Sequence, residues 1–189
     1  MQIFSRISEP FPEDTSVALG AFDGVHLGHR AVISEAVRLA ERDGLVPAVF
    51  TFSDLPKSSL MPGGSKIEPL SDFGERARLI GELGIRALFA PDFASVRGIG
   101  AADFVEKVLV NTLRAKRVVC GEDYRFGAFG AGDAALLERL CREYGAVLTV
   151  VPPVTYDGEK ISSTLIRSLL REGRLEEAGR LLGRRDGRH

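Results

Sequence analysis

Continuous apolar runs and amphipathic stretches alternate along almost the whole chain. Five apolar runs have the length and composition of buried strands: residues 16–22, 46–52, 85–91, 116–123 and 146–153. Helical spacing of apolar positions occurs at residues 29–44, 71–84, 101–113, 132–145, 162–173 and 174–183. Apolar strands separated by helices indicate a parallel sheet covered on both faces, and right-handed crossovers make it doubly wound. We therefore expect an α/β fold with a Rossmann-like parallel sheet of about five strands and helices on both faces.

Local signals predict where several elements begin and end. Gly44 ends the first long helix, and either Ser71 or Asp72 caps the start of the next. Residues 53–69 contain three prolines and a Gly-Gly pair, which predicts an irregular loop. Ligands of a doubly wound sheet bind at the carboxyl ends of its strands, so the segments that follow the strands are the candidates for chemistry.

Composition narrows the class of protein. The chain has 189 residues, of which 44% are hydrophobic and 27% charged, and its formal net charge is −1. This balance is typical of a folded domain and gives no bulk attraction to nucleic acid or to an anionic membrane. Because there is no signal-peptide core and no run of about 18 apolar residues, we expect no membrane span and a cytoplasmic location. Two cysteines exclude a four-cysteine zinc site, and three histidines, one of them the last residue, make a histidine metal site unexpected.

The segment Gly20–His29, GAFDGVHLGH, leaves the first predicted strand and enters the first predicted helix. It contains neither G-x-G-x-x-G nor a Walker A loop. Two imidazoles lie three residues apart at a helix N-terminus, where backbone N–H groups and the helix dipole favour an anion. A single histidine there could be a cap or a surface residue, but H-x-G-H at a strand-to-helix junction favours a phosphate site.

A second candidate segment is Ile161–Arg167, ISSTLIR. Ser162 or Ser163 can cap a helix, and Arg167 follows about one turn later with a guanidinium that suits a phosphate. Hydroxyls, a helix N-terminus and an arginine together predict a polyphosphate cradle.

With these two motifs, the sequence resembles the H-x-G-H nucleotidyltransferases, and most closely the FAD synthetase (FMN adenylyltransferase) module of bacterial riboflavin kinase/FAD synthetases. The resemblance runs from about Ser16 to Gly183 and includes GAFDGVHLGH, TFSDLP, GEDYRFGAFGAGD, VPP and ISSTLIRSLLREG. It implies a Rossmann-like enzyme that uses ATP, with Mg²⁺, and FMN to make FAD and pyrophosphate.

The resemblance also implies roles for individual residues. His26, His29 and Arg167 would take part in catalysis by binding the ATP phosphates. Further ATP-binding residues would be Gly20, Phe22, Asp23, Gly24, Gly28, Ser162, Ser163 and Thr164. The flavin side would comprise Phe52, Leu55, Asp123, Tyr124, Phe126 and Gly127. No metal ligand is expected from the chain itself.

This sequence departs from the family pattern in two places. Where the family reads T-F-x-P-H-P, residues 51–56 read TFSDLP, so Asp54 and Leu55 replace a proline and a histidine. We expect one nucleotidyltransferase domain at residues 1–183, a polar tail at 184–189, and no riboflavin kinase domain.

These departures leave the acceptor open. The first hypothesis is an FMN adenylyltransferase, and the second is an adenylyl- or cytidylyltransferase that acts on another phosphorylated small molecule. A third is a non-catalytic flavin- or nucleotide-binding module, which the complete pair of phosphate motifs disfavours. Oligomeric state is left open.

Overall fold

The structure, a computed structural model, describes residues 1–54 and 68–183. Its main sheet has six parallel strands in the order β1-β4-β3-β2-β5-β6. The strands are β1 (Gln2–Phe4), β2 (Thr15–Leu19), β3 (Val46–Phe50), β4 (Ala87–Phe89), β5 (Ala115–Gly121) and β6 (Val147–Val151). Chain order reverses at β2, which pairs with β3 on one side and β5 on the other. The expected doubly wound α/β fold is confirmed.

The five expected strands are present, but the estimate of about five omitted β1. This strand pairs in parallel with β4 at the sheet edge, with Gln2 opposite Ala87 and Phe4 opposite Phe89. It is three residues long and Ile3 is half exposed, so it carries no apolar run that a sequence pattern could detect. Pairing with β4 stabilises the extended conformation of β1, which its own sequence does not predict.

Both faces of the sheet are covered, as predicted. Along β2, Val17 and Leu19 pack into one core and Ala18 packs into the other, which is the alternation that a strand imposes. One face packs against α1 (Leu27–Asp43) and α2 (Phe73–Glu82). The other packs against η2 (Phe104–Thr112) and α5 (Ala134–Glu143).

The predicted helix at residues 101–113 has an unusual geometry. One turn of α-helix, α4 (Ala101–Asp103), leads into η2, which is wound as a π-helix. The N–H of Leu113 accordingly donates to the carbonyl of Val108, five residues earlier (2.8 Å). Phe104, Val108 and Leu109 still reach the core, so apolar residues of this segment are buried in spite of the wider helix.

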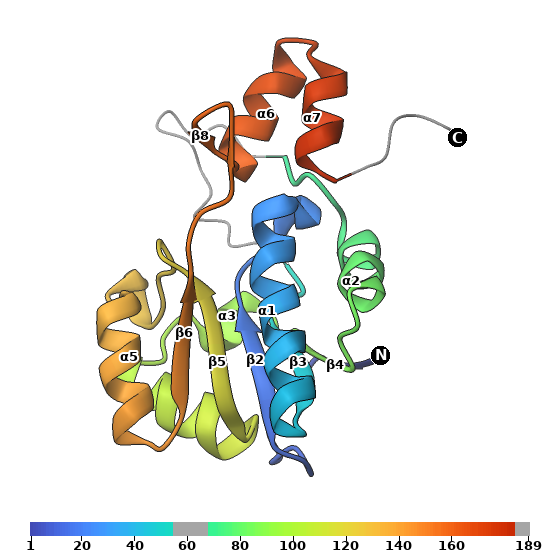
Figure 1. Cartoon of the computed structure of the whole chain (residues 1–189). Coiled ribbons are helices and arrows are strands. Elements are labelled where there is room, and N and C mark those ends of the chain that lie inside the picture. The colour runs from blue at the N-terminus through green and yellow to red at the C-terminus, as the bar shows by residue number, and fades with distance from the viewer. Residues whose placement is uncertain (55–67, 184–189) are drawn as a thin grey trace.

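Several short elements complete the chain. They are η1 (Asp23–Val25), α3 (Phe93–Val96), η3 (Ala128–Gly130) and the hairpin β7 (Thr155–Tyr156) with β8 (Glu159–Lys160). Two final helices, α6 (Ser163–Arg171) and α7 (Leu175–Leu181), pack together around a small core of their own. They lie beyond the carboxyl ends of the sheet strands (Figure 1). None of the helices in the described ranges has the length and hydropathy of a membrane span.

The predicted helix ends are largely confirmed. Gly44 ends α1 in the left-handed conformation, with φ of 67°. Asp72 caps α2 by accepting the N–H of Glu75 (2.8 Å), whereas the Ser71 hydroxyl accepts the N–H of Gly24 (3.0 Å). Ser71 therefore ties α2 to the loop after β2 instead of capping the helix.

Candidate active site

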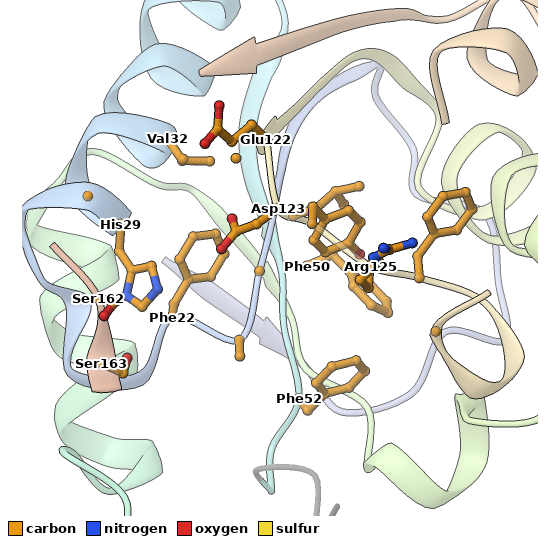
Figure 2. Close-up of a pocket in the computed structure, with 18 of the residues that line it drawn as sticks. Phe22, His29, Val32, Phe50, Phe52, Glu122, Asp123, Arg125, Ser162 and Ser163 are labelled. Carbon is orange, nitrogen blue, oxygen red and sulfur yellow. The ribbon is translucent and has the colours of Figure 1, made fainter. Parts of the chain in front are cut away.

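A cavity of about 1210 Å³ opens where the chain order of the sheet reverses. Its lining includes the last residues of four strands: Leu19, Phe50, Gly121 and Val151. Small-molecule pockets usually have a volume of roughly 300–1,000 Å³, so this cavity has room for two substrates. Figure 2 shows His29, Ser162 and Ser163 on one side of it and Phe50, Phe52 and Arg125 on the other. We call the first side the polar end and the second the aromatic end.

Two histidines form the centre of the polar end. His26 is the N-cap of α1, and its Nδ1 accepts the backbone N–H of His29 (3.3 Å). The two rings stack, with centroids 3.6 Å apart and planes 19° from parallel. Because Nδ1 of His26 accepts a hydrogen bond, the neutral ring carries its proton on Nε2, where it is available as a donor.

Burial keeps both histidines neutral at pH 7. It lowers the pKa of His26 to about 4, an effect that Asp123 opposes and Lys160 reinforces. Burial also holds the pKa of His29 well below its usual value, with His26 and Arg76 acting in the same direction. The pair therefore presents hydrogen-bond donors to an anion and does not present imidazolium charges.

The residues around the pair hold the two rings in place. A Cβ at Gly28 would lie 3.2 Å from the His26 ring, so the glycine lets that ring fold back over the helix start. Phe22 is buried and meets His29 edge-on at 5.3 Å. Its backbone is left-handed (φ 52°), as is that of Val25 (φ 43°), so this turn is strained where it positions the histidines.

The start of α6 forms the floor of the polar end. The Ser162 hydroxyl oxygen caps α6 by accepting the N–H of Leu165 (3.1 Å), so its hydrogen is available to a ligand. The Ser163 hydroxyl donates to the carbonyl of Asp23 (3.2 Å). Of the two candidate caps, Ser162 and Ser163, the structure uses Ser162, and both serines line the cavity.

Arg167 and Asp23 lie outside the cavity lining, in contact with each other. The Arg167 guanidinium pairs with the Asp23 carboxylate, and its Nε donates to the carbonyl of Glu68 (2.9 Å). Asp23 also accepts the backbone N–H groups of Leu70 (2.9 Å) and Ser71 (3.3 Å). Burial raises the pKa of Asp23, while Arg167 opposes that rise. In this structure the pair fastens α6 to the loop after β2.

Lys160 is a cation of the polar end that the motifs did not single out. It lines the cavity immediately before Ile161, and its Nζ lies 3.0 Å from Asp123 and 3.9 Å from Glu122. Its position immediately before the ISST segment is the sequence feature that could have indicated its place in the site.

Six aromatic rings line the aromatic end and contact one another in a row, which we call the aromatic wall. They are Phe93, Phe52, Phe50, Phe104, Phe126 and Tyr124, with successive centroids 5.1 to 6.1 Å apart. The rings come from four separate parts of the chain: the end of β3, α3, the start of η2 and the segment after β5. Such a surface suits a planar, apolar ring system.

Most of the predicted site residues therefore lie in one cavity. Those that line it are Gly20, Phe22, His26, Gly28, His29, Phe52, Asp123, Tyr124, Phe126, Gly127, Ser162 and Ser163. Asp23, Gly24, Thr164 and Arg167 do not line it, and Leu55 lies outside the described residues. The individual roles in ATP and flavin binding stay predictions.

Arg76 of α2 is a further residue that the motifs missed. It is buried, and its guanidinium donates to the carbonyls of Ala21, Phe52 and Ser53. One side chain thus joins the loop after β2 to the loop after β3. Its Nε has no hydrogen-bond partner among the residues that the structure describes, and burial lowers the pKa of the guanidinium.

Comparison with known families agrees with this geometry. A family model described as FAD synthetase matches residues 8–165. The chain belongs to the FAD synthetase family. This confirms the resemblance to that family drawn from H-x-G-H and ISSTLIR.

Curated relatives carry names from the same family. The chain is 38% identical over 168 residues to a bifunctional riboflavin kinase/FMN adenylyltransferase of Listeria monocytogenes, covering 88% of this chain and 53% of that protein. It is 32% identical to a Listeria monocytogenes FAD synthetase, covering 88% and 68%. It is also 32% identical to the bifunctional enzyme of Escherichia coli K12, covering 94% and 57%. The chain thus spans about half the length of the bifunctional relatives.

Solved structures show the same fold. A Streptococcus pneumoniae structure described as a macrolide-efflux protein superimposes with a TM-score of 0.82 at 32% identity, covering 96% of this chain and 59% of that one. Pantoate-beta-alanine ligase of Francisella tularensis superimposes with a TM-score of 0.63 at 16% identity, covering 98% and 80%. The second likeness concerns the fold alone.

Proposed function

We propose that this protein is an FMN adenylyltransferase that transfers AMP from ATP to FMN, giving FAD and pyrophosphate. The observation that carries the proposal is the neutral, stacked pair His26–His29 at the start of α1, facing the same cavity as the aromatic wall. The polar end suits phosphates and the aromatic wall suits the isoalloxazine ring. The names of the family and of its curated relatives support this activity.

The chemistry needs positioning and charge stabilisation more than it needs proton transfer. An oxygen of the FMN phosphate attacks the α-phosphorus of ATP in line, the bond from that phosphorus to the bridging oxygen breaks, and pyrophosphate leaves. Nε2–H of His26 donates to the reacting phosphates, and His29 lies beside it. The free N–H groups at the start of α1 add partial positive charge where negative charge accumulates.

The remaining phosphates would be held by α6 and Lys160. The Ser162 hydroxyl hydrogen is available, whereas the Ser163 hydrogen is directed to the Asp23 carbonyl. We retain Arg167 and Thr164 as phosphate ligands because of the family resemblance. For that role Arg167 would have to exchange Asp23 for a phosphate, to which its fork is equally suited.

Mg²⁺ would enter on the phosphates of ATP. In the described ranges no group of three or more His, Cys, Asp or Glu side chains could hold a metal ion. Mg²⁺ is usually bound by substrate phosphates and water with one or two carboxylates, and it would neutralise phosphate charge here. A cytoplasmic location also stays a prediction.

The test is the formation of FAD and pyrophosphate from FMN, ATP and Mg²⁺, followed by chromatography. His29→Asn should lower the rate by about 10²–10³-fold, by analogy with the loss of an oxyanion donor. The matched control is His189→Asn, which changes a histidine outside both motifs and should leave the rate unchanged. Absence of FAD at every FMN and ATP concentration would contradict the proposal.

A changed acceptor is the principal alternative, motivated by Asp54 and Leu55. The Asp54 carboxylate accepts the N–H of Phe93 (2.8 Å), so it is engaged in fixing the start of α3. Leu55→His, assayed beside the wild type, separates the two cases. Faster FAD formation would mean a weakened FMN site, whereas no FAD from either protein but transfer to another phosphate acceptor would establish the alternative.

A further inference from the structure

Phe129 is exposed in a way that nothing else in the described chain explains. Its side chain is 105% exposed, so the whole ring faces solvent. Its backbone is left-handed, with φ of 58° and ψ of 18°. Bulky L-residues rarely adopt this conformation because Cβ crowds the backbone. Phe129 is therefore unfavourable twice over in the free protein, which indicates a functional constraint.

The loop that carries Phe129 is tightly built. Phe126 and Gly132 exchange two backbone hydrogen bonds (3.1 and 2.9 Å), and the N–H of Gly130 donates to the carbonyl of Gly127 (3.0 Å). A Cβ at Gly127 would lie 3.0 Å from the backbone of Ala101, so the loop is also pressed against α4. These contacts hold the tip, and with it Phe129, in one place before any ligand binds.

The position of the tip identifies what Phe129 can contact. Phe129 lines the large cavity together with the aromatic wall, and it follows Phe126 of that wall by three residues. The wall rings contact one another, whereas Phe129 has no ring partner among the described residues. We propose that Phe129 is a specificity-determining residue that stacks on the isoalloxazine ring of the acceptor and completes the aromatic wall. This assignment rests on the proposed function.

The donor's adenine is the other planar ring in the reaction. The phosphate groups of both substrates must meet at His26 and His29, so the two ring systems extend away from that point in different directions. The cavity lining includes the aromatic wall and also Val151, Pro152 and Pro153 at the end of β6. The aromatic wall offers the larger planar surface, so we assign it and Phe129 to the tricyclic flavin.

The experiment measures the binding of FMN, riboflavin and ATP separately, by titration. Phe129→Gly removes the ring and suits the positive φ, so the protein should fold at least as well as the wild type. The dissociation constants of FMN and of riboflavin should each rise about tenfold, within the range measured for stacking of bases on aromatic side chains. The dissociation constant of ATP should stay unchanged. Phe129→Tyr keeps the ring and should bind FMN like the wild type.

The control is Leu175→Ala, which removes a side chain that is 65% exposed on α7 and outside the cavity lining. The proposal would be overturned if Phe129→Gly bound FMN with unchanged affinity, or if it bound ATP more weakly but not FMN. A change in oligomeric state alone would also overturn it. If riboflavin and FMN bind with an affinity that depends on Phe129 but no FAD forms, the proposed function alone is refuted. Normal FAD formation with unaltered flavin affinity would refute the role of Phe129 alone, and a wild type that binds no flavin would refute both.

Discussion

Acidification should destabilise this protein through His26, and the variant His26→Asn isolates the effect. Asparagine is a good N-cap, so its side-chain oxygen can still accept the backbone N–H of His29 while no longer titrating. The folded-state pKa of His26 is about 4, below the ordinary histidine value of 6.5 that applies to the unfolded chain. Below pH 6.5 the unfolded state therefore binds more protons than the folded state, and the free energy of unfolding falls as pH falls.

The size of the effect follows from these two pKa values. One pKa unit corresponds to about 1.4 kcal/mol, so lowering the pH from 7 to 5 should cost the wild type about 2 kcal/mol through His26. The loss should continue to about pH 4, where the folded state also takes up the proton. The lowered pKa of His29 also makes the free energy of unfolding fall with pH. His29 and the carboxylates with altered pKa values are present in both the wild type and His26→Asn, so the comparison concerns His26.

The assay is urea unfolding followed by far-ultraviolet circular dichroism at pH 7, 6 and 5. The wild type should lose about 2 kcal/mol more than His26→Asn between pH 7 and pH 5, because only the wild type protonates this ring on unfolding. Parallel decreases in the two proteins would show that His26 is not held neutral by burial, and the description of the pair as neutral donors would be wrong.

Four further substitutions test other parts of the structure, with Arg78→Gln as the exposed control for Arg76→Gln. Arg76→Gln removes a buried guanidinium that serves three carbonyls and should lower the free energy of unfolding by about 3 kcal/mol in urea titrations. The exposed Arg78→Gln should cost at most about 1 kcal/mol. Gly28→Ala places a Cβ against the His26 ring and should reduce FAD formation at least about tenfold while circular dichroism stays unchanged. Leu109→Ala empties a fully buried site and should cost about 3 kcal/mol without changing the Michaelis constants of either substrate.

The features that the sequence predicts correctly are those that depend on neighbouring residues. The five apolar runs, the helix periods, Gly44 as a helix end and a serine cap at residue 162 or 163 all arise from patterns within a few positions. H-x-G-H belongs to the same kind, because a histidine that caps a helix necessarily lies one turn from a histidine three residues later. Both rings therefore reach the same helix end, as the spacing indicates.

The contact of Arg167 could not be predicted from local spacing. Its spacing from Ser162 puts it one turn into α6, as expected, but its partner Asp23 lies 144 residues earlier. Helix spacing gives the side of the helix on which a side chain emerges, but it cannot give the group that the side chain meets. The same limit applies to Arg76, whose three carbonyl partners come from two loops that only the folded sheet brings together.

The two ends of the cavity therefore differ in how they are encoded. The polar end depends on two motifs, each of them a continuous stretch that can be recognised in the sequence. The aromatic wall is instead assembled from four separate segments. Each of its phenylalanines has the sequence surroundings of an ordinary core residue, and several of them are indeed core residues on their other face. Substitutions in the wall or at Phe129 could thus alter the acceptor while H-x-G-H and ISSTLIR remain intact. The proposed nucleotidyl transfer therefore rests on the two motifs, whereas the proposed acceptor, FMN, rests on the aromatic wall and Phe129.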